Sequence, residues 1–241
     1  MPDWTDPTAY SFTADLSADQ WAWEFLRRCP RYRSAWLDFI TTWRALEATY
    51  GRPAERDVAA WQRDPRAWVP AVECRDSDCR VDGDKVLIEC AMGARWGFYK
   101  FPPDPGDDDP VGGGRLVWRE QPVSVRLLEE EPAAIRPSVE EALVCFDLSL
   151  PLAGQLEAAK RCLQMEQRRR IRSGRVLAPR LAGHREQLCR QLRLLDALEA
   201  EVNPELIRQR LYAGVDGDYI HERDQAIELR DRDYRRLLLL G

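Results

Sequence analysis

The sequence has no run of about 18 apolar residues, the length that a membrane-spanning helix needs. It begins with Pro2, Asp3 and Trp4, and it lacks the basic stretch followed by an apolar stretch that marks a secretory signal peptide. We therefore expect a cytoplasmic protein without a membrane partner. The seven cysteines are scattered along the chain, which in a reducing compartment indicates free thiols more often than disulfides.

Histidine is scarce. The two histidines, His184 and His221, lie near no Gly-x-Ser-x-Gly elbow, reactive-cysteine context or zinc-binding histidine pair. The cluster Cys74, Cys79 and Cys90 lacks the two-residue spacing of a zinc knuckle, so we expect no metal and no other cofactor. We expect that the protein is not an enzyme, although a pair of carboxylates brought together by the fold remains an alternative.

The charges are unevenly distributed. The net charge is −5, yet residues 160–193 carry eleven Lys and Arg against two acids, Glu166 and Glu186. Residues 1–150 have a net charge of −9 and residues 151–241 one of +4. A positive segment in an acidic protein indicates a negatively charged partner, and duplex DNA is the first candidate. Lysine accounts for only three of the 36 basic residues, which favours bidentate phosphate and guanine recognition, but a GC-rich genome produces the same bias.

Hydrophobic periodicity predicts three regions. Apolar residues of 17–50 recur at helical spacing, with a capping box at Ser17 and a break at Pro30. Four short runs, 86–90, 116–119, 123–128 and 143–148, are typical of strands, and an acidic, glycine-rich loop covers 102–114. From Pro151 the pattern predicts four helices, the third capped by Asn203 and the last running from about His221 to Leu239.

We therefore predict an α+β fold with three parts. Residues 1–72 form an aromatic-rich helical domain, and residues 73–150 form a small, mostly antiparallel sheet with the acidic flexible loop. Residues 151–241 form a basic helical bundle in which a short capped helix, a turn and a last helix follow the order of a helix-turn-helix.

Candidate site residues follow from this organisation. The expected contacts to DNA phosphates are Arg168, Arg169, Arg170, Arg172, Arg175 and Arg180. The expected contacts to base edges, from the last helix, are Arg223, Arg230 and Arg232. A protein partner or a second subunit would contact Trp21, Trp23, Arg27, Arg28 and Tyr32, but the pattern favours the alternative that these aromatic residues form a small helical core with the arginines on its solvated face.

Two parts of the chain resemble known domains. The segments 2–10 and 21–33 resemble the N-terminal transcriptional-regulator-like domain of proteobacterial proteins, and 146–158, 192–198, 207–212 and 232–237 resemble the C-terminal DNA-binding domain often fused to it. Excision activators of integrative and conjugative elements have this pairing, so the resemblance implies a bacterial transcription factor of a mobile genetic element. The family usually has Gly-Ala-Ser before the short helix and a basic last helix, whereas this chain has Glu201-Val202-Asn203 and a last helix of zero net charge. These departures shift the expected DNA contacts toward Arg168 to Arg180.

A second hypothesis is an antiactivator or adaptor that binds a protein partner and not DNA. The net charge of −5, the neutral last helix and the apolar tail from Leu237 favour it. Arginines that lie together on one face would favour DNA, whereas arginines paired with the acidic half of the chain would favour the adaptor.

Overall fold

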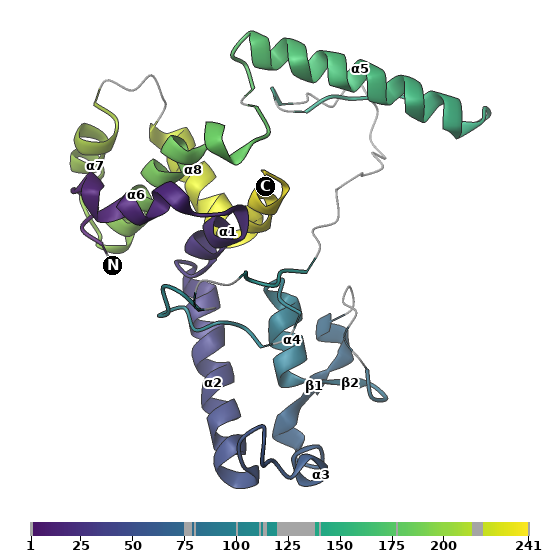
Figure 1. Ribbon diagram of the computed structural model, residues 1–241, viewed down its shortest axis with the longest axis vertical. Coiled ribbons are helices and arrows are strands. Elements are labelled where there is room, and N and C mark those ends of the chain that lie inside the picture. Colours follow the sequence, from purple (N-terminus) through teal and green to yellow (C-terminus); the bar gives the residue numbers. More distant parts are fainter. Residues whose placement is uncertain are drawn as a thin grey trace. The chain divides into compact units, whose positions relative to one another are not determined.

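The computed structural model (Figure 1) describes residues 2–74, 79, 81–99, 101–110, 112, 115–119, 138–139, 141–176, 178–213 and 219–240. The chain forms two compact units. Unit 1 comprises residues 1–121 together with 185–241, and unit 2 comprises residues 122–184. The predicted boundary after residue 72 therefore falls inside unit 1, and the one after residue 150 falls inside unit 2.

Unit 1 begins with a 3-10 helix, η1 (Pro7–Asp15), followed by α1 (Ala18–Leu26) and α2 (Pro30–Tyr50). The backbone N–H of Ser17 donates to the side chain of Gln20 at 2.9 Å, as the predicted capping box requires. Proline lacks a backbone N–H and is tolerated in the first turn of a helix, so Pro30 ends one helical stretch and starts the next. The predicted helix, break and helix are confirmed.

The middle of unit 1 contains less strand than predicted. After α3 (Val58–Trp61) and η2 (Pro65–Ala67), β1 (Trp68–Pro70) pairs antiparallel with β2 (Lys85–Leu87), with Trp68 opposite Leu87. The 3-10 helix η3 (Ala71–Cys74) follows β1, and α4 (Ile88–Arg95) follows β2. An α+β fold with a small antiparallel sheet is thus confirmed.

Three of the four predicted strands differ from the structure. The strand predicted through Cys90 stops at Leu87, because Ile88, Ala91 and Met92 recur at helical spacing and bury one face of α4. Residues 116–119 form only an isolated bridge between Trp118 and Phe98. Residues 143–148 form no regular element, and the described residues of unit 2 contain no strand for them to pair with. The run 123–128 lies outside the described residues.

The C-terminal part of unit 1 contains α6 (Arg185–Glu199), α7 (Pro204–Leu211) and α8 (Tyr219–Glu228). As predicted, the side chain of Asn203 caps α7 by accepting from the backbone N–H of Glu205 at 2.8 Å. The last helix does not continue as one α-helix. After Glu228 it becomes a π-helical turn, η6 (Leu229–Asp233), and then a 3-10 helix, η7 (Tyr234–Leu240).

One core joins the two ends of the chain. Helix α1 packs on η7, and α6 packs on α7, α8 and η1. Aromatic rings fill the space: Tyr32 meets Trp23 and Trp96 edge-on, with centroids 5.9 and 5.2 Å apart. The hydroxyl of Tyr234 in η7 donates to the Trp96 carbonyl at 3.1 Å. Helix α1 therefore packs against residues more than 200 positions farther along the chain.

Unit 2 has a different character. It contains α5 (Leu152–Arg172) and the 3-10 helix η5 (Leu181–Gly183), and no residue of α5 is buried. Residues 141–150 lie along α5 in the opposite direction (Figure 1). At one end Asp147 exchanges hydrogen bonds of 2.9 Å with Gln155, and at the other Arg170 donates to the carbonyl groups of Val139 and Glu141. Among the described helices of both units, none is long and apolar enough to cross a membrane.

Candidate functional site

Three arginines lie on one face of α5. Arg161, Arg168 and Arg172 are separated by seven and four residues, spacings that return to the same side of an α-helix. At a rise of about 1.5 Å per residue, they span about 16 Å along the helix. The apolar residues Leu152, Leu156 and Leu163 follow the opposite side. The three arginines, which form a basic face, and the three leucines therefore lie on opposite sides of α5.

The three arginines of this basic face are exposed, and no carboxylate pairs with them among the described residues. They lie in a helix that carries six basic and two acidic residues. Arg168 and Arg172 lie in the last two turns, where positive charge also interacts favourably with the helix dipole. Glu157 lies one turn before Arg161 on the same side, but no ion pair neutralises the three arginines among the described residues, so the face has a net positive charge suited to an anionic partner.

Arg169 and Arg170 have another arrangement, because both pair with Glu166. Arg169 contacts Glu166 with two hydrogen bonds of 2.7 and 2.6 Å, and Arg170 adds one of 2.8 Å. The hydrogen bonds from Arg169 and Arg170 lower the pKa of Glu166 to about 2. Arg170 also anchors Val139 and Glu141, so its predicted phosphate contact would compete with three hydrogen bonds of its guanidinium inside unit 2.

The end of α5 fixes where the next arginine lies. Gly174 has a φ of +70°, a left-handed conformation that closes the helix, and its N–H donates to Ile171 while the N–H of Arg175 donates to Arg170. This Schellman-type end places Arg175 directly after the helix, exposed. Arg180 is also exposed, and neither side chain has an ion pair in the part of the chain that the structure describes.

The arginines predicted to read base edges are mostly neutralised. Arg223 contacts Asp224, and Arg230 contacts Asp231, each through two hydrogen bonds of 2.7 to 3.0 Å. Arg232 is exposed and has no ion pair among the described residues. These three arginines belong to unit 1, whereas the basic face of α5 belongs to unit 2.

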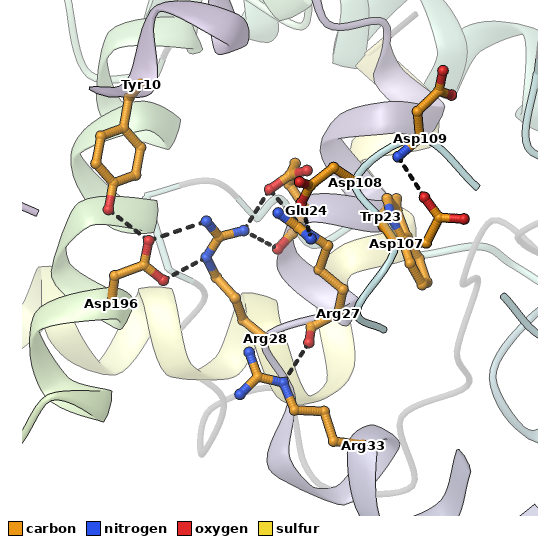
Figure 2. A network of polar contacts seen from close by, with 10 residues as sticks. All are labelled: Tyr10, Trp23, Glu24, Arg27, Arg28, Arg33, Asp107, Asp108, Asp109 and Asp196. Atoms are coloured by element: carbon orange, nitrogen blue, oxygen red, sulfur yellow. Dashed lines mark hydrogen bonds and ion pairs between the residues drawn. The ribbon is translucent and has the colours of Figure 1, made fainter. Parts of the chain in front are cut away.

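The residues predicted to contact a protein partner lie inside unit 1. The side chains of Trp21, Trp23 and Tyr32 are at most 1% exposed, in agreement with the alternative that they form a core. Arg28 is 3% exposed, and its guanidinium donates to Asp196 at 2.7 and 3.0 Å and to Glu24 at 2.5 Å (Figure 2). These four side chains are therefore not accessible to a protein partner in the folded unit.

Further contacts complete this buried network. The hydroxyl of Tyr10 donates to Asp196 at 2.5 Å, and Arg27 bridges Glu24 and Asp108 at 3.1 and 2.5 Å (Figure 2). Burial disfavours the charge of Arg28, but the hydrogen bonds and charges of Asp196 and Glu24 outweigh it and raise the pKa of Arg28. The network links η1, α1 and α6 within unit 1.

Sequence reasoning missed Arg161 as a site residue. The signal was present in the sequence, because the spacing Arg161, Arg168 and Arg172 already indicates a common helix face. Counting charges could not separate it from Arg170, which has the same charge but points to carbonyl groups of the segment 138–150.

One comparison with known proteins gives a match. Residues 3–68 match the family described as the proteobacterial transcriptional regulator-like domain. No curated protein and no solved structure matches the chain. The match covers η1, α1, α2, α3 and η2, and it supports a role in transcription regulation. It ends at Trp68, before α5 and the C-terminal helices.

Proposed function

We propose that the protein is a DNA-binding transcriptional regulator whose phosphate contacts come from the basic face of α5 and the arginines that follow it. The observation that carries the proposal is the alignment of exposed Arg161, Arg168 and Arg172 on one side of a helix with no buried residue. Arg175 and Arg180 extend the positive surface beyond the helix end. The regulator-like match of residues 3–68 supports the assignment to transcription.

The electrostatics of α5 suit duplex DNA. The duplex carries one negative charge per about 1.7 Å of its axis, so a row of guanidinium groups about 16 Å long meets several phosphates at once. Arginine forms a planar fork that matches phosphate oxygens in bidentate geometry. Contacts of this kind supply affinity that is independent of sequence, and they release counterions.

Sequence preference would come from other residues. Arg232 is our candidate for a base edge, because it is exposed while Arg223 and Arg230 already bind aspartates. The order α6, α7 and α8 agrees with a helix-turn-helix order, in which α8 would approach the major groove. Under this proposal the regulator acts in a bacterial cell, on the DNA of a mobile element.

A second candidate function is an adaptor that binds a protein partner. The observation that favours it is a row of exposed apolar side chains on one side of α5, in which Leu152, Leu156 and Leu163 are 46%, 55% and 40% exposed. Apolar side chains gathered on a surface are typical of protein contacts.

Binding of the full chain to fluorescent duplex DNA separates the two functions. Anisotropy is measured with a duplex from the protein's own upstream region and with a mixed-sequence duplex, across a salt series. We expect binding that weakens steeply with salt and that prefers the upstream duplex. Absence of binding at about 50 mM salt, where phosphate contacts are strong, would contradict DNA binding and favour the adaptor.

A further inference from the structure

Three cysteines gather in one part of unit 1. Cys74 is buried in a small apolar cluster with Val86 and Ala91. Cys79 and Cys90 pack against the same cluster and are partly exposed. All three are present as thiols, and none of them belongs to the proposed DNA contacts. Thiols that a fold brings together can be oxidised to a disulfide, and the surroundings of each sulfur decide which one reacts first.

Cys79 contacts Cys90 directly. The Cys79 thiol donates to the backbone carbonyl group of Cys90, with 3.4 Å between the sulfur and the oxygen. A carbonyl oxygen lies about 2.4 Å from the Cα atom of its own residue, so the Cys79 sulfur is within about 6 Å of the Cys90 Cα. Rotation of the Cys90 side chain and a small local shift therefore suffice to bring the two sulfur atoms to bonding distance.

The guanidinium of Arg119 also contacts the Cys79 sulfur. Its Nη2 donates to that sulfur at 3.4 Å. Two further hydrogen bonds hold the guanidinium in place, from Nε to the Phe98 carbonyl at 2.7 Å and from Nη2 to the Tyr99 carbonyl at 3.4 Å. A cation fixed beside a sulfur stabilises the thiolate, which is the form that attacks peroxides. Cys79 is also more accessible than Cys74, which is only 8% exposed.

Cys90 is placed to act as the second thiol. It lies in the first turn of α4, where the positive end of the helix dipole favours a thiolate. Cys79 and Cys90 stand on either side of β2 in the sequence, so a disulfide between them would close a short loop around that strand. A short loop keeps the second thiol close to the first one throughout the reaction.

We propose that Cys79 and Cys90 form a peroxide-reactive pair, in which Cys79 is the attacking thiol and Cys90 the resolving thiol. The inference goes beyond the proposed function, because it assigns a modification site to unit 1 and requires no DNA.

The oxidation has two steps, and hydrogen peroxide is the oxidant. The Cys79 thiolate attacks one oxygen of the peroxide, the O–O bond breaks, and the leaving hydroxide takes up the proton that the thiol released. This step forms a sulfenic acid and one water. The Cys90 thiol then attacks the same sulfur, the S–O bond breaks, and a second water leaves as the disulfide forms. The two sulfur atoms together lose two electrons, which reduce one peroxide to two waters.

Peptide mapping of the full chain tests the pair. Trypsin cuts after Lys and Arg, so it places Cys74, Cys79 and Cys90 in three separate peptides, 67–75, 76–80 and 86–95. The reduced protein is treated with hydrogen peroxide, the remaining thiols are alkylated, and the digest is analysed by mass spectrometry without reduction. We expect a disulfide between peptides 76–80 and 86–95. It should form before Cys145 and Cys162 are oxidised, although these two are more exposed.

The variant Cys90→Ala isolates the first step. Without the resolving thiol the sulfenic acid of Cys79 persists, so dimedone, a reagent for sulfenic acids, should label peptide 76–80. Cys162→Ala is the matched control, because it removes an exposed thiol of α5. It should form the disulfide between peptides 76–80 and 86–95 at the wild-type rate.

Substitution of Arg119 tests the activation of Cys79. Arg119→Gln removes the cation from the sulfur, so the oxidation of Cys79 should slow at least about tenfold. Arg119→Lys keeps a cation and should recover part of the rate, which separates the loss of charge from the loss of shape. Arg115→Gln removes the same charge from an exposed position four residues earlier and should keep the wild-type rate.

Three results would overturn the proposal. If peptides 76–80 and 86–95 stay fully alkylated at peroxide concentrations that oxidise Cys162, exposure alone governs these thiols. A disulfide from peptide 76–80 to peptide 67–75 would give the resolving role to Cys74. An unchanged rate in Arg119→Gln would show that the guanidinium does not activate Cys79. All of these outcomes are read without DNA, so they are distinguishable from a failure of DNA binding.

Discussion

The guanidinium of Arg28 binds the carboxylate of Asp196, 168 residues farther along the chain, through two hydrogen bonds of 2.7 and 3.0 Å. The two side chains are 3% and 1% exposed. Arg28 lies just after α1, inside the region that matches the regulator-like family, whereas Asp196 lies in α6, outside it. The matched region therefore completes its core with a distant part of the same chain.

Loss of this buried pair should destabilise unit 1 strongly. In Asp196→Asn the shape is kept but a buried arginine loses a charged partner, which typically costs about 3 to 5 kcal/mol. Glu199→Gln on the same helix breaks the more exposed pair with Arg33, which typically contributes about 0 to 1 kcal/mol. Urea unfolding followed by tryptophan fluorescence measures both. Equal losses in the two variants would contradict a structural role for the network.

The family-matched region should not fold alone. A fragment of residues 3–68 lacks Asp196, Trp96 and η7, against which α1 packs, so we expect an unfolded spectrum in circular dichroism and NMR. A chain in which a flexible Gly/Ser linker replaces residues 122–184 keeps all these contacts and should unfold cooperatively. A folded fragment 3–68 would show that the long-range contacts are dispensable.

Stability should depend on pH through Glu89. Burial raises the pKa of this carboxyl group above its usual value, opposed by the charge of Arg56. A raised pKa means that the folded state holds the proton more tightly than the unfolded state does. Its stabilising effect is present at low pH and is lost as the pH rises from the unfolded pKa through the folded one.

The measurement compares the wild type with Glu89→Gln, which cannot ionise. The free energy of unfolding from urea titrations between about pH 4 and pH 8, a range that brackets the usual pKa of Glu, should favour the variant increasingly as the pH rises. A difference that stays constant across this range would mean that Glu89 ionises normally in the folded protein.

Local structure could be predicted from the sequence more accurately than contacts between distant residues. Pro30 at a helix start and Asn203 as a cap act on neighbouring backbone groups, so both could be read from a few residues. The strand Trp68–Pro70 was not predicted, because its three residues pair with a partner fifteen or more positions away and one of them is proline. Helix α4 was missed because the apolar run 86–90 contains the end of a strand and the start of a helix.

For the candidate site, too, local features could be predicted and long-range contacts could not. The basic segment was evident from composition, and so was its place on a helix. The sequence did not show which arginines are available, because Arg170 binds carbonyl groups about 30 residues upstream, while Arg168 is exposed and has no ion pair among the described residues. The core position of Trp21, Trp23 and Arg28 depends on α6, α4 and η7, whose proximity no local pattern encodes.

The most direct test removes the basic face of α5 and measures the salt dependence of duplex binding. In Arg161→Ala/Arg168→Ala/Arg172→Ala, each lost phosphate contact lowers the slope of log affinity against log salt by about 0.9, so the slope should fall by up to about 2.7. The control Arg44→Ala/Arg52→Ala/Arg63→Ala removes three exposed arginines of unit 1 and the same total charge, and it should keep the wild-type slope. Equal slopes for the two triple variants would contradict the assignment of the phosphate contacts to α5.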